Sequence, residues 1–428
     1  LVSGMLVLYS LALLVVFVVG SPWWLFRMAT SGKYREGLTE RLGRVPRRIR
    51  AGLDEKAVVW IHAVSVGEVL AASRLIEELT CRGKDSWKPW RVVISTTTRT
   101  GQKLAREKFG AERVFYFPLD FAFAVRSWLR VLRPQMLILL ETEFWPRMLV
   151  ECRRAGVQVA VVNARISDRS WPRYCDFSFL WGRLLSGLSL VLAQSEIDAG
   201  RLRSLGAPNV QVTGNLKYDI RAARPAAATA MLREHLPPGI AVLVCGSTLA
   251  GEEQLLVDAL PPWVITILAP RHPERFGEVA DLLLRRAPLW VRRSEWMSAP
   301  AQIQPGTVFL LDSIGELASV YSLATAAFVG GSLIPAGGHN PLEPAQFGVP
   351  VLMGPHYENF RGIVEALQKN EGIRIVVPDQ LEPALAEMLS GSPAARMQGI
   401  RGREVFEAEA GATGRAVAAL TTLLEKRR

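Results

Sequence analysis

Cysteine is scarce in this chain of 428 residues, which has only Cys81, Cys152, Cys175 and Cys245. The four lie far apart and no two form a Cys-x-x-Cys pair, so the sequence indicates neither a zinc site nor a disulfide framework. Free thiols fit a reducing compartment, which favours the cytoplasm.

The common phosphate-binding signatures are also absent. There is no Walker A loop and no Gly-x-Gly-x-x-Gly, so a P-loop or dinucleotide motif is not supported. No short-period repeat or low-complexity tract occurs. With 49% hydrophobic and 21% charged residues, the chain has a globular composition, which excludes disorder as its main state.

Acidic residues are outnumbered, 40 Asp and Glu against 51 Lys and Arg, for a formal net charge of +11. Such an excess favours an anionic partner, namely nucleic acid, a membrane surface or a phosphorylated substrate. Charge alone does not choose among the three.

Residues 1–26 carry no charge at all. As a helix, residues 1–20 would span roughly 30 Å, about the thickness of a bilayer core. We expect residues 20–22, Gly-Ser-Pro, to end that helix, and Trp23 and Trp24 to suit the headgroup level. The segment is therefore a candidate membrane anchor.

A basic block follows at residues 27–50, where Arg and Lys outnumber Glu eight to two, and the positive-inside rule keeps that side cytoplasmic. A cleaved signal peptide and a buried helix are the alternatives. The lack of a charged n-region and the position of the basic block after the apolar run favour an anchor. We expect an N-terminal anchor at residues 1–26 and a basic juxtamembrane segment at 27–56.

From Ala57 onward, short apolar runs alternate with amphipathic segments, the βαβ rhythm of a parallel, doubly wound α/β sheet. The rhythm breaks between Tyr218 and Pro238 and then restarts. The expected strands are residues 58–61, 91–95, 114–117, 136–140, 157–162 and 188–193, then 241–245, 264–268, 308–311, 326–329 and 349–353.

Two Rossmann-like halves follow from this pattern. We expect an N-terminal Rossmann-like domain at residues 57–217, a linker at 218–238, a second Rossmann-like domain at 239–400 and a terminal helix at 401–428. Ligands of open parallel sheets bind beyond the carboxyl ends of the strands, so polar residues at those ends are the candidates for chemistry.

Two acidic stretches follow expected strands in the first half. Glu68 ends His-Ala-Val-Ser-Val-Gly-Glu at a strand-to-helix junction, yet Ser65-x-x-Glu68 is also a capping box with Glu68 at position N3. Glu141 and Glu143 follow the strand at 136–140 and either face a ligand or begin the next helix at its positive end. Lys217 closes the first half in Gly-Asn-Leu-Lys, where it is either solvated or neutralises a ligand's negative charge.

In the second half, Pro270 and Arg271 come directly after an expected strand. An arginine side chain can donate two hydrogen bonds to phosphate oxygens in a bidentate geometry. Ser313-Ile-Gly-Glu316 repeats the capping-box pattern, so a capping role for Glu316 stays open.

The stretch at residues 330–343, Gly-Gly-Ser-Leu-Ile-Pro-Ala-Gly-Gly-His-Asn-Pro-Leu-Glu, is the most informative. Its four glycines allow close approach of backbone amides to a ligand. Asn340 reads as an N-cap, Pro341 as N1 and Glu343 as N3 of a helix whose positive end would attract an anion. A purely structural glycine loop is the alternative.

These stretches, together with Asn-Ala-Arg at 163–165 and Leu-Met-Gly-Pro-His at 352–356, occur in the order seen in Kdo (3-deoxy-D-manno-octulosonic acid) transferases. The chain resembles that family from its N-terminal apolar segment nearly to its end. The resemblance implies a GT-B fold, in which two Rossmann-like domains face each other across a cleft and a C-terminal helix commonly packs back on the first domain.

The resemblance also implies a function: inverting transfer of Kdo from CMP-Kdo to lipid IVA, a phosphorylated lipid A precursor, in lipopolysaccharide core biosynthesis. Glu68 corresponds to the general base, and Glu141 and Lys217 match positions that stabilise the transition state. The CMP contacts map onto Pro270, Arg271, Ile314, Gly315, Glu316, Asn340, Pro341, Leu342 and Glu343.

No cofactor or metal is implied, because CMP has a single phosphate and no Asp-x-Asp pair stands at a strand end. The implied partners are the donor, the acceptor and the inner membrane, with the catalytic domains on its cytoplasmic side, and no nucleic acid. Two other functions are weighed: a GT-B enzyme that uses a UDP-sugar, and a non-catalytic lipid-binding protein at the membrane surface.

Overall fold

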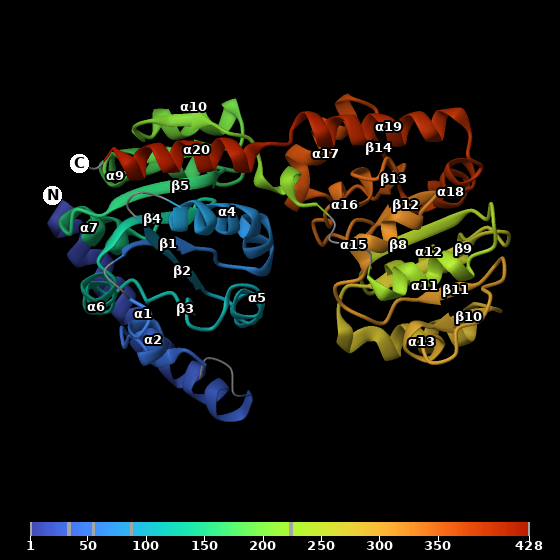
Figure 1. Cartoon of the computed structure of the whole chain (residues 1–428), viewed down its shortest axis with the longest axis horizontal. Coiled ribbons are helices and arrows are strands. Elements are labelled where there is room, and N and C mark those ends of the chain that lie inside the picture. The colour runs from blue at the N-terminus through green and yellow to red at the C-terminus, as the bar shows by residue number, and fades with distance from the viewer. Residues whose placement is uncertain (1, 32–35, 54–55, 86–88, 222–225, 427–428) are drawn as a thin grey trace. The chain divides into compact units, whose positions relative to one another are not determined.

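The computed structural model describes residues 2–31, 36–53, 56–85, 89–221 and 226–426 (Figure 1). The chain forms two compact units. The first unit consists of Leu1–Ile220 and Ala410–Arg428, and the second unit of Arg221–Glu409. Each unit contains a parallel sheet, as the βαβ rhythm predicts, and each sheet has seven strands.

The first sheet is buried on both faces, because alternate residues of each strand point to opposite sides and nearly all of them are apolar. Its exposed edge strand, β7, has only three residues, and we did not predict it. In their order across the sheet the strands are β3 (Val114–Tyr116), β2 (Trp90–Thr96), β1 (Ala57–His62), β4 (Pro134–Leu140), β5 (Gln158–Ala164), β6 (Leu190–Ala193) and β7 (Val210–Val212).

Helices cover both faces of the first sheet and separate its core into two clusters. The cluster around Trp60 and Trp128 includes α6 (Ala122–Leu132), α7 (Pro146–Arg154), α9 (Ser178–Leu185) and α10 (Glu196–Ser204). The cluster on the other face includes α4 (Val66–Asp85), α5 (Arg99–Phe109) and α20 (Ala412–Glu425). The shorter helices of the unit are α2 (Leu38–Arg41), α3 (Arg47–Arg50), α8 (Trp171–Asp176) and η1 (Leu216–Asp219).

The second sheet repeats this arrangement. Its two edge strands were not predicted, because each has three residues and carries an arginine. In their order across the sheet the strands are β10 (Trp290–Arg292), β11 (Val308–Leu310), β9 (Ile265–Pro270), β8 (Val242–Thr248), β12 (Ala326–Val329), β13 (Val351–Met353) and β14 (Ile373–Ile375).

The helices of the second unit also lie on both faces of its sheet. Residues of α12, α13, α18 and α19 join one core cluster, and residues of α11, α14 and α15 join the other. Helix α11 falls within residues 218–238, the expected linker, and its Leu232 is fully buried. The bounds are α11 (Ala227–His235), α12 (Glu252–Asp258), η2 (Pro273–Arg275), α13 (Phe276–Arg286), α14 (Arg293–Trp296), α15 (Leu317–Val320), η3 (Tyr321–Leu323), α16 (Leu342–Ala345), η4 (Glu358–Phe360), α17 (Arg361–Lys369), η5 (Pro378–Gln380), α18 (Leu381–Leu389) and α19 (Pro393–Ala408).

The N-terminal helix α1 runs from Val2 to Ser31. The predicted stop at residues 20–22 is wrong, because one proline removes only its own N–H and a helix can continue beyond it. Leu6–Trp23 is the one span of the described helices that is long and apolar enough to cross a membrane. Only 6% of that span is buried, which does not support a buried helix and is compatible with either an anchor or a signal sequence.

The C-terminal segment forms two helices, where we expected one at residues 401–428. Helix α19 ends at Ala408 and α20 begins after Gly411, whose φ of 91° is a left-handed conformation that interrupts the helix. Helix α20 packs on the first sheet through Ala416, Val417 and Leu420. The buried carboxylate of Asp219 accepts hydrogen bonds from the backbone N–H groups of Gly411 and Thr413, which fixes the start of that helix.

Candidate functional site

The first sheet has a topological switch point between β1 and β4. From β1 the strands continue outward through β2 and β3, and the chain then returns to add β4 to β7 on the other side of β1. Ligands of open parallel sheets bind beyond the carboxyl ends of the strands at such a point. Glu68 lies in the first turn of α4, after β1, and Glu141 follows β4 directly. The topology therefore brings two of the predicted catalytic residues to neighbouring strand ends.

Glu68 is half-buried and is held by the turn that precedes α4. Its Oε2 accepts a hydrogen bond from Val64 N at 2.8 Å, and its Oε1 accepts one from Ser65 Oγ at 3.0 Å. Ser65 Oγ in turn accepts from Glu68 N at 3.4 Å. The predicted capping box is present in a shifted form, because the carboxylate reaches the amide of Val64 instead of that of Ser65. Capping thus holds the carboxylate in one orientation.

The electrostatic environment of Glu68 disfavours its charged form. Burial raises the pKa of Glu68 to about 7, and the neighbouring carboxylates of Glu141 and Glu143 contribute to the rise. Burial, with a further contribution from Glu141, also raises the pKa of Glu143. A carboxyl group whose pKa lies near neutral pH can both accept and release a proton, which suits general acid–base chemistry.

Glu141 has a φ of 54°, in the left-handed region that non-glycine residues seldom adopt. Its N–H donates to Val162 O of β5 at 2.9 Å, so the turn stays attached to the sheet. Such a conformation costs roughly 1–3 kcal/mol and is concentrated at functional sites. Local strain and topology therefore coincide at Glu141.

Lys217, in η1, completes this group. Its Nζ lies 4.0 Å from Glu141 Oε1. Burial lowers the pKa of Lys217, and the carboxylates of Glu141 and Glu68 counter that effect. The three residues predicted to be catalytic thus form one electrostatically coupled cluster within the first unit, which we call the carboxylate–lysine cluster.

Asn163 supports the cluster, and the sequence alone did not assign it a role. It is buried at the end of β5 with a φ of 60°. Its Oδ1 accepts a hydrogen bond from Leu216 N at 3.0 Å, and its carbonyl accepts one from Gln194 Nε2 at 3.0 Å. Asn163 therefore ties η1, and with it Lys217, to the sheet. An asparagine directly after four apolar residues of the strand, 159–162, was the signal.

The predicted CMP-binding residues all lie at the carboxyl ends of strands in the second sheet, whose switch point is between β8 and β12. Pro270 ends β9 and Arg271 follows it. Residues 314–316 come after β11, and residues 340–343 come after β12. Strands β11, β9, β8 and β12 are consecutive neighbours, so these positions share one edge of one sheet.

Arg271 is electrostatically coupled to two residues of the loop that follows β12. Burial lowers the pKa of His339 to about 4, and the charge of Arg271 adds to the fall. Burial raises the pKa of Glu343 to about 7, and Arg271 opposes that rise. The backbone N–H of Arg271 donates to Thr248 O at 3.0 Å, which fixes the chain as it leaves β9.

The helix predicted to begin at Asn340 differs from expectation. Helix α16 is a single turn, Leu342–Ala345, and its N-cap position is Pro341. The side chain of Asn340 nevertheless accepts a hydrogen bond from Leu342 N at 3.2 Å. One turn has little macrodipole, so attraction for an anion must come mainly from Arg271 and the loop amides.

Residues Ile314, Gly315 and Glu316 form a turn with mixed exposure. Ile314 is 65% exposed, and Gly315 has a φ of 90°. The Glu316 carboxylate accepts hydrogen bonds from Ser313 Oγ and, at 2.8 Å, from Arg293 Nη2. Glu316 occupies the N-cap position of α15 and not N3, so the predicted capping box is wrong in register.

Among the described residues, no group of three or more His, Cys, Asp or Glu side chains is placed to hold a metal ion.

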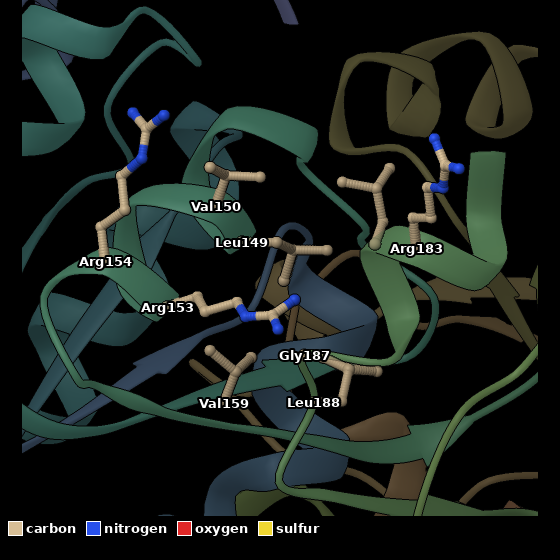
Figure 2. A pocket seen from close by; sticks show the side chains of 9 residues that line it. Leu149, Val150, Arg153, Arg154, Val159, Arg183, Gly187 and Leu188 are labelled. Atoms are coloured by element: carbon tan, nitrogen blue, oxygen red, sulfur yellow. The ribbon is translucent and has the colours of Figure 1, made fainter. Parts of the chain in front are cut away.

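A separate pocket of about 410 Å³ lies at α7, α9 and the start of β5 (Figure 2). Figure 2 shows Arg153 extending between Leu149 and Val159, while Arg154 points away. Because Val159 is near the amino end of β5, this pocket lies at the opposite edge of the sheet from Glu141. It is a different site from the carboxylate–lysine cluster.

Comparison with known proteins gives consistent results. Residues 36–220 match the sequence profile of a family described as 3-deoxy-D-manno-octulosonic-acid transferase (kdotransferase). A 3-deoxy-D-manno-octulosonic acid transferase of Haemophilus influenzae is 34% identical over 412 residues, which cover 92% of this chain and 93% of that protein. A protein of the same name from Bordetella pertussis is 34% identical over 423 residues, covering 93% of this chain and 94% of that protein.

Solved structures resemble the fold at much lower identity. A glycosyltransferase from Rickettsia africae matches with a TM-score of 0.54 and 14% identity. The match covers 88% of this chain and 100% of the Rickettsia africae chain. At this identity the likeness concerns the fold alone. It confirms the predicted GT-B architecture of two Rossmann-like parallel sheets.

Proposed function

The chain belongs to the Kdo transferase family of glycosyltransferases, and from this membership we propose that it transfers Kdo from CMP-Kdo to lipid IVA with inversion at the anomeric carbon. The observation that carries the proposal is the carboxylate–lysine cluster at the β1–β4 switch point, where Glu68 has a pKa raised by burial to about 7. The sequence motifs name these three residues, and the positions of Glu68 and Glu141 at neighbouring strand ends support the proposal.

Glu68 acts as the general base. A hydroxyl of the acceptor sugar attacks the anomeric carbon of Kdo, the bond from that carbon to the CMP phosphate oxygen breaks, and the hydroxyl proton passes to Glu68. The hydrogen bonds from Val64 N and Ser65 Oγ hold the carboxylate in one orientation, so little reorganisation accompanies proton transfer. Glu141 and Lys217 stabilise the charge that develops in the transition state.

The second unit binds the donor. Negative charge grows on the leaving CMP phosphate, and Arg271 with the amides of the loop after β12 can meet it. Glu343, which is electrostatically coupled to Arg271, is proposed to accept a hydrogen bond from a ribose hydroxyl. CMP has one phosphate, so these donors suffice without the metal that a diphosphate commonly needs.

Helix α1 anchors the protein in the inner membrane, with the catalytic units on the cytoplasmic side. The basic segment after it attracts anionic headgroups and favours that orientation. A phosphorylated acceptor with lipid tails lies in the same leaflet, so anchoring raises the chance of encounter.

Product masses test the proposal directly. The full-length protein is incubated with CMP-Kdo and lipid IVA in detergent, and the products are weighed. We expect the mass of lipid IVA to increase by whole Kdo residues, with CMP released in proportion. No Kdo addition by the folded protein would refute the proposal.

Competition separates the two other functions. CMP should inhibit the reaction and UDP should not, whereas a UDP-sugar transferase would show the reverse. A non-catalytic lipid-binding protein would consume no nucleotide sugar and would bind lipid equally well after loss of Glu68.

A further inference from the structure

Glu252 is a fully buried carboxylate at the first position of α12. Its Oε2 accepts hydrogen bonds from Leu249 N at 2.9 Å and Gly331 N at 2.6 Å. Its Oε1 accepts hydrogen bonds from Ser332 N at 2.8 Å and Leu333 N at 2.9 Å. All four donors are backbone amides, and both oxygens are fully used.

The four amides come from the two loops at the switch point of the second sheet. Leu249 follows β8, and residues 331–333 follow β12. Since β8 and β12 are neighbouring strands, Glu252 lies between their carboxyl ends and is bonded to both loops. This is the place where an open parallel sheet binds its ligand.

Both loops lead to residues of the proposed donor site. At the end of β8, just before Leu249, Thr248 O accepts the hydrogen bond from Arg271 N. After β12, the loop doubles back, so that Gly338 N donates to Gly331 O at 2.7 Å and His339 N donates to Gly330 O at 3.1 Å. Residues 340–343 follow at once. Glu252 is therefore connected to Arg271 through Leu249 and its neighbour Thr248, and to the loop before residues 340–343 through Gly331.

The backbone where β8 ends needs an external restraint. Ser247, the next-to-last residue of β8, has a φ of 57°, which residues other than glycine seldom adopt. A Cβ on Gly330 would lie 2.6 Å from Ser247 O, so the ends of β8 and β12 are in close contact. Sparsely populated conformations persist only where surrounding structure enforces them. The Glu252 carboxylate supplies four of the hydrogen bonds that do so.

We propose that Glu252 is a positioning residue for the donor site: its carboxylate fastens the loop after β8 to the loop after β12 and thereby holds Arg271 and residues 340–343 in the arrangement that binds CMP-Kdo. The inference rests on the proposed function for the identity of the ligand. Glu252 itself does not touch the donor.

Glu252→Gln tests this role with little change in size. One carboxylate oxygen becomes an NH₂ group, which cannot accept hydrogen bonds, so two buried N–H groups lose their partner. The loops then occupy the binding arrangement for only part of the time, and apparent affinity falls by that fraction. We expect the KM for CMP-Kdo and the Kd for CMP to rise about tenfold, if the competent fraction falls to about one-tenth. At saturating donor the kcat should stay within about threefold, because bound donor selects the competent arrangement.

Glu253→Gln is the matched control. Glu253 is the next residue of the same helix and is just as buried, but its carboxylate binds the guanidinium of Arg275 at 2.7 and 3.2 Å. We expect that variant to lose stability and to keep the KM for CMP-Kdo within about twofold. If Glu252→Gln does not fold, Glu252→Asp takes its place in the KM, CMP-binding and exchange measurements. Aspartate keeps both carboxylate oxygens on a side chain that is shorter by one methylene group.

Amide hydrogen exchange of residues 330–340 in the ligand-free, full-length protein gives a readout that needs no substrate. Faster exchange there in Glu252→Gln than in Glu253→Gln, together with weaker CMP binding, would support the inference. Unchanged exchange, unchanged CMP affinity, or an equal effect in both variants would overturn it. Failure of the wild-type protein to bind CMP would reject the proposed donor instead, and the exchange comparison would still judge whether Glu252 orders the loops.

Discussion

The ammonium of Lys217 lies 4.0 Å from the carboxylate of Glu141, although Lys217 belongs to η1, after β7, and Glu141 follows β4. The distance exceeds that of a hydrogen bond, so the two groups are coupled by charge and not by a shared proton. Glu141 is held by the strained turn after β4, and Lys217 by η1, which Asn163 ties to β5. The pair is therefore fixed from two elements, both of which are hydrogen-bonded to β5.

Lys217→Met should lower turnover strongly and leave the folded protein intact. Removing one electrostatic donor from a transition state typically costs about 100- to 1,000-fold in kcat. Burial lowers the pKa of Lys217, so removing its charge should offset part of the cost of leaving the Glu141 carboxylate without this partner. Steady-state kinetics and thermal melting check both points. A kcat within threefold of wild type would remove Lys217 from the mechanism.

Glu68→Gln should abolish most turnover while preserving the fold and CMP affinity. The amide oxygen of Gln can still accept a hydrogen bond from Val64 N, so helix α4 keeps its cap. An amide cannot take the acceptor's proton, and loss of a general base costs about 100- to 10,000-fold in rate. Rates are measured with both substrates saturating, and CMP binding by calorimetry. If most of the rate survives, the base is elsewhere, and Glu141 or Glu143 becomes the first candidate.

Activity and stability should depend on pH in opposite directions near neutrality. The base must be ionised, so kcat/KM should rise as pH increases through about 7, the pKa to which burial raises Glu68. For stability, the folded pKa lies above the ordinary value of 4.5, so between these values the folded state holds more protons than the unfolded state. Stability should therefore fall as pH rises across that window, and Glu343 adds to the fall. Melting at pH 5 and pH 8 checks this, with a smaller difference expected in Glu68→Gln. An equal difference would mean that Glu68 titrates near its ordinary value.

Much of the fold could be predicted because its strands are apolar on both faces and are bounded by polar strand ends. The same pattern located Glu68, Glu141 and Arg271, because each comes shortly after a strand that was recognised from its run of apolar residues. Edge strands β10 and β14 escaped prediction because three residues that include an arginine carry no periodic signal.

The residues that organise the site were harder to find. Glu252 binds amides 79, 80 and 81 positions away in the chain, and no local pattern records such a contact. The register of α16 was missed because Asn340 caps Leu342 while Pro341 takes the N-cap position. Propensity rules assign the N-cap to one residue, whereas here Pro341 occupies the N-cap position and the side chain of Asn340 makes the capping hydrogen bond.

Helix α1 should tether the protein and have no part in the chemistry. A chain beginning at Arg27 should leave the bilayer fraction more easily, most of all at high salt, because salt screens the attraction of the basic segment to anionic lipid. Its activity on detergent-dispersed acceptor should persist. Truncation also removes the hydrogen bond from Tyr9 to Asp120 and the contact of Phe17 with Phe121, so some stability should be lost.

Tyr9→Phe in the full-length chain separates the two effects, because it removes only the bond to Asp120. This variant should stay in the membrane fraction with a slightly lower melting temperature. A truncated protein that is folded but inactive on dispersed lipid would contradict a purely anchoring role.

Arg271 and Glu343 should prove to be the main side-chain contributors to CMP affinity. Arg271→Ala should weaken CMP binding by about 1.5–3 kcal/mol, the range for a hydrogen bond to a charged group. Arg286→Ala is the matched control, since that arginine lies in the same unit and pairs with Asp258 on the surface at 3.3 Å. It should leave CMP affinity unchanged.

For Glu343, binding and helix capping make different predictions. Asn340 Oδ1 already accepts the hydrogen bond from Leu342 N, so the capping function lies with Asn340. Glu343→Ala should therefore weaken CMP binding and should not lower the melting temperature appreciably. At pH 8 the variant should be slightly more stable than the wild type, because it lacks a half-buried carboxyl group whose pKa is raised. Loss of about 1 kcal/mol of stability with unchanged CMP affinity would instead assign Glu343 to the helix. Melting and CMP titration of the same protein samples decide between the two.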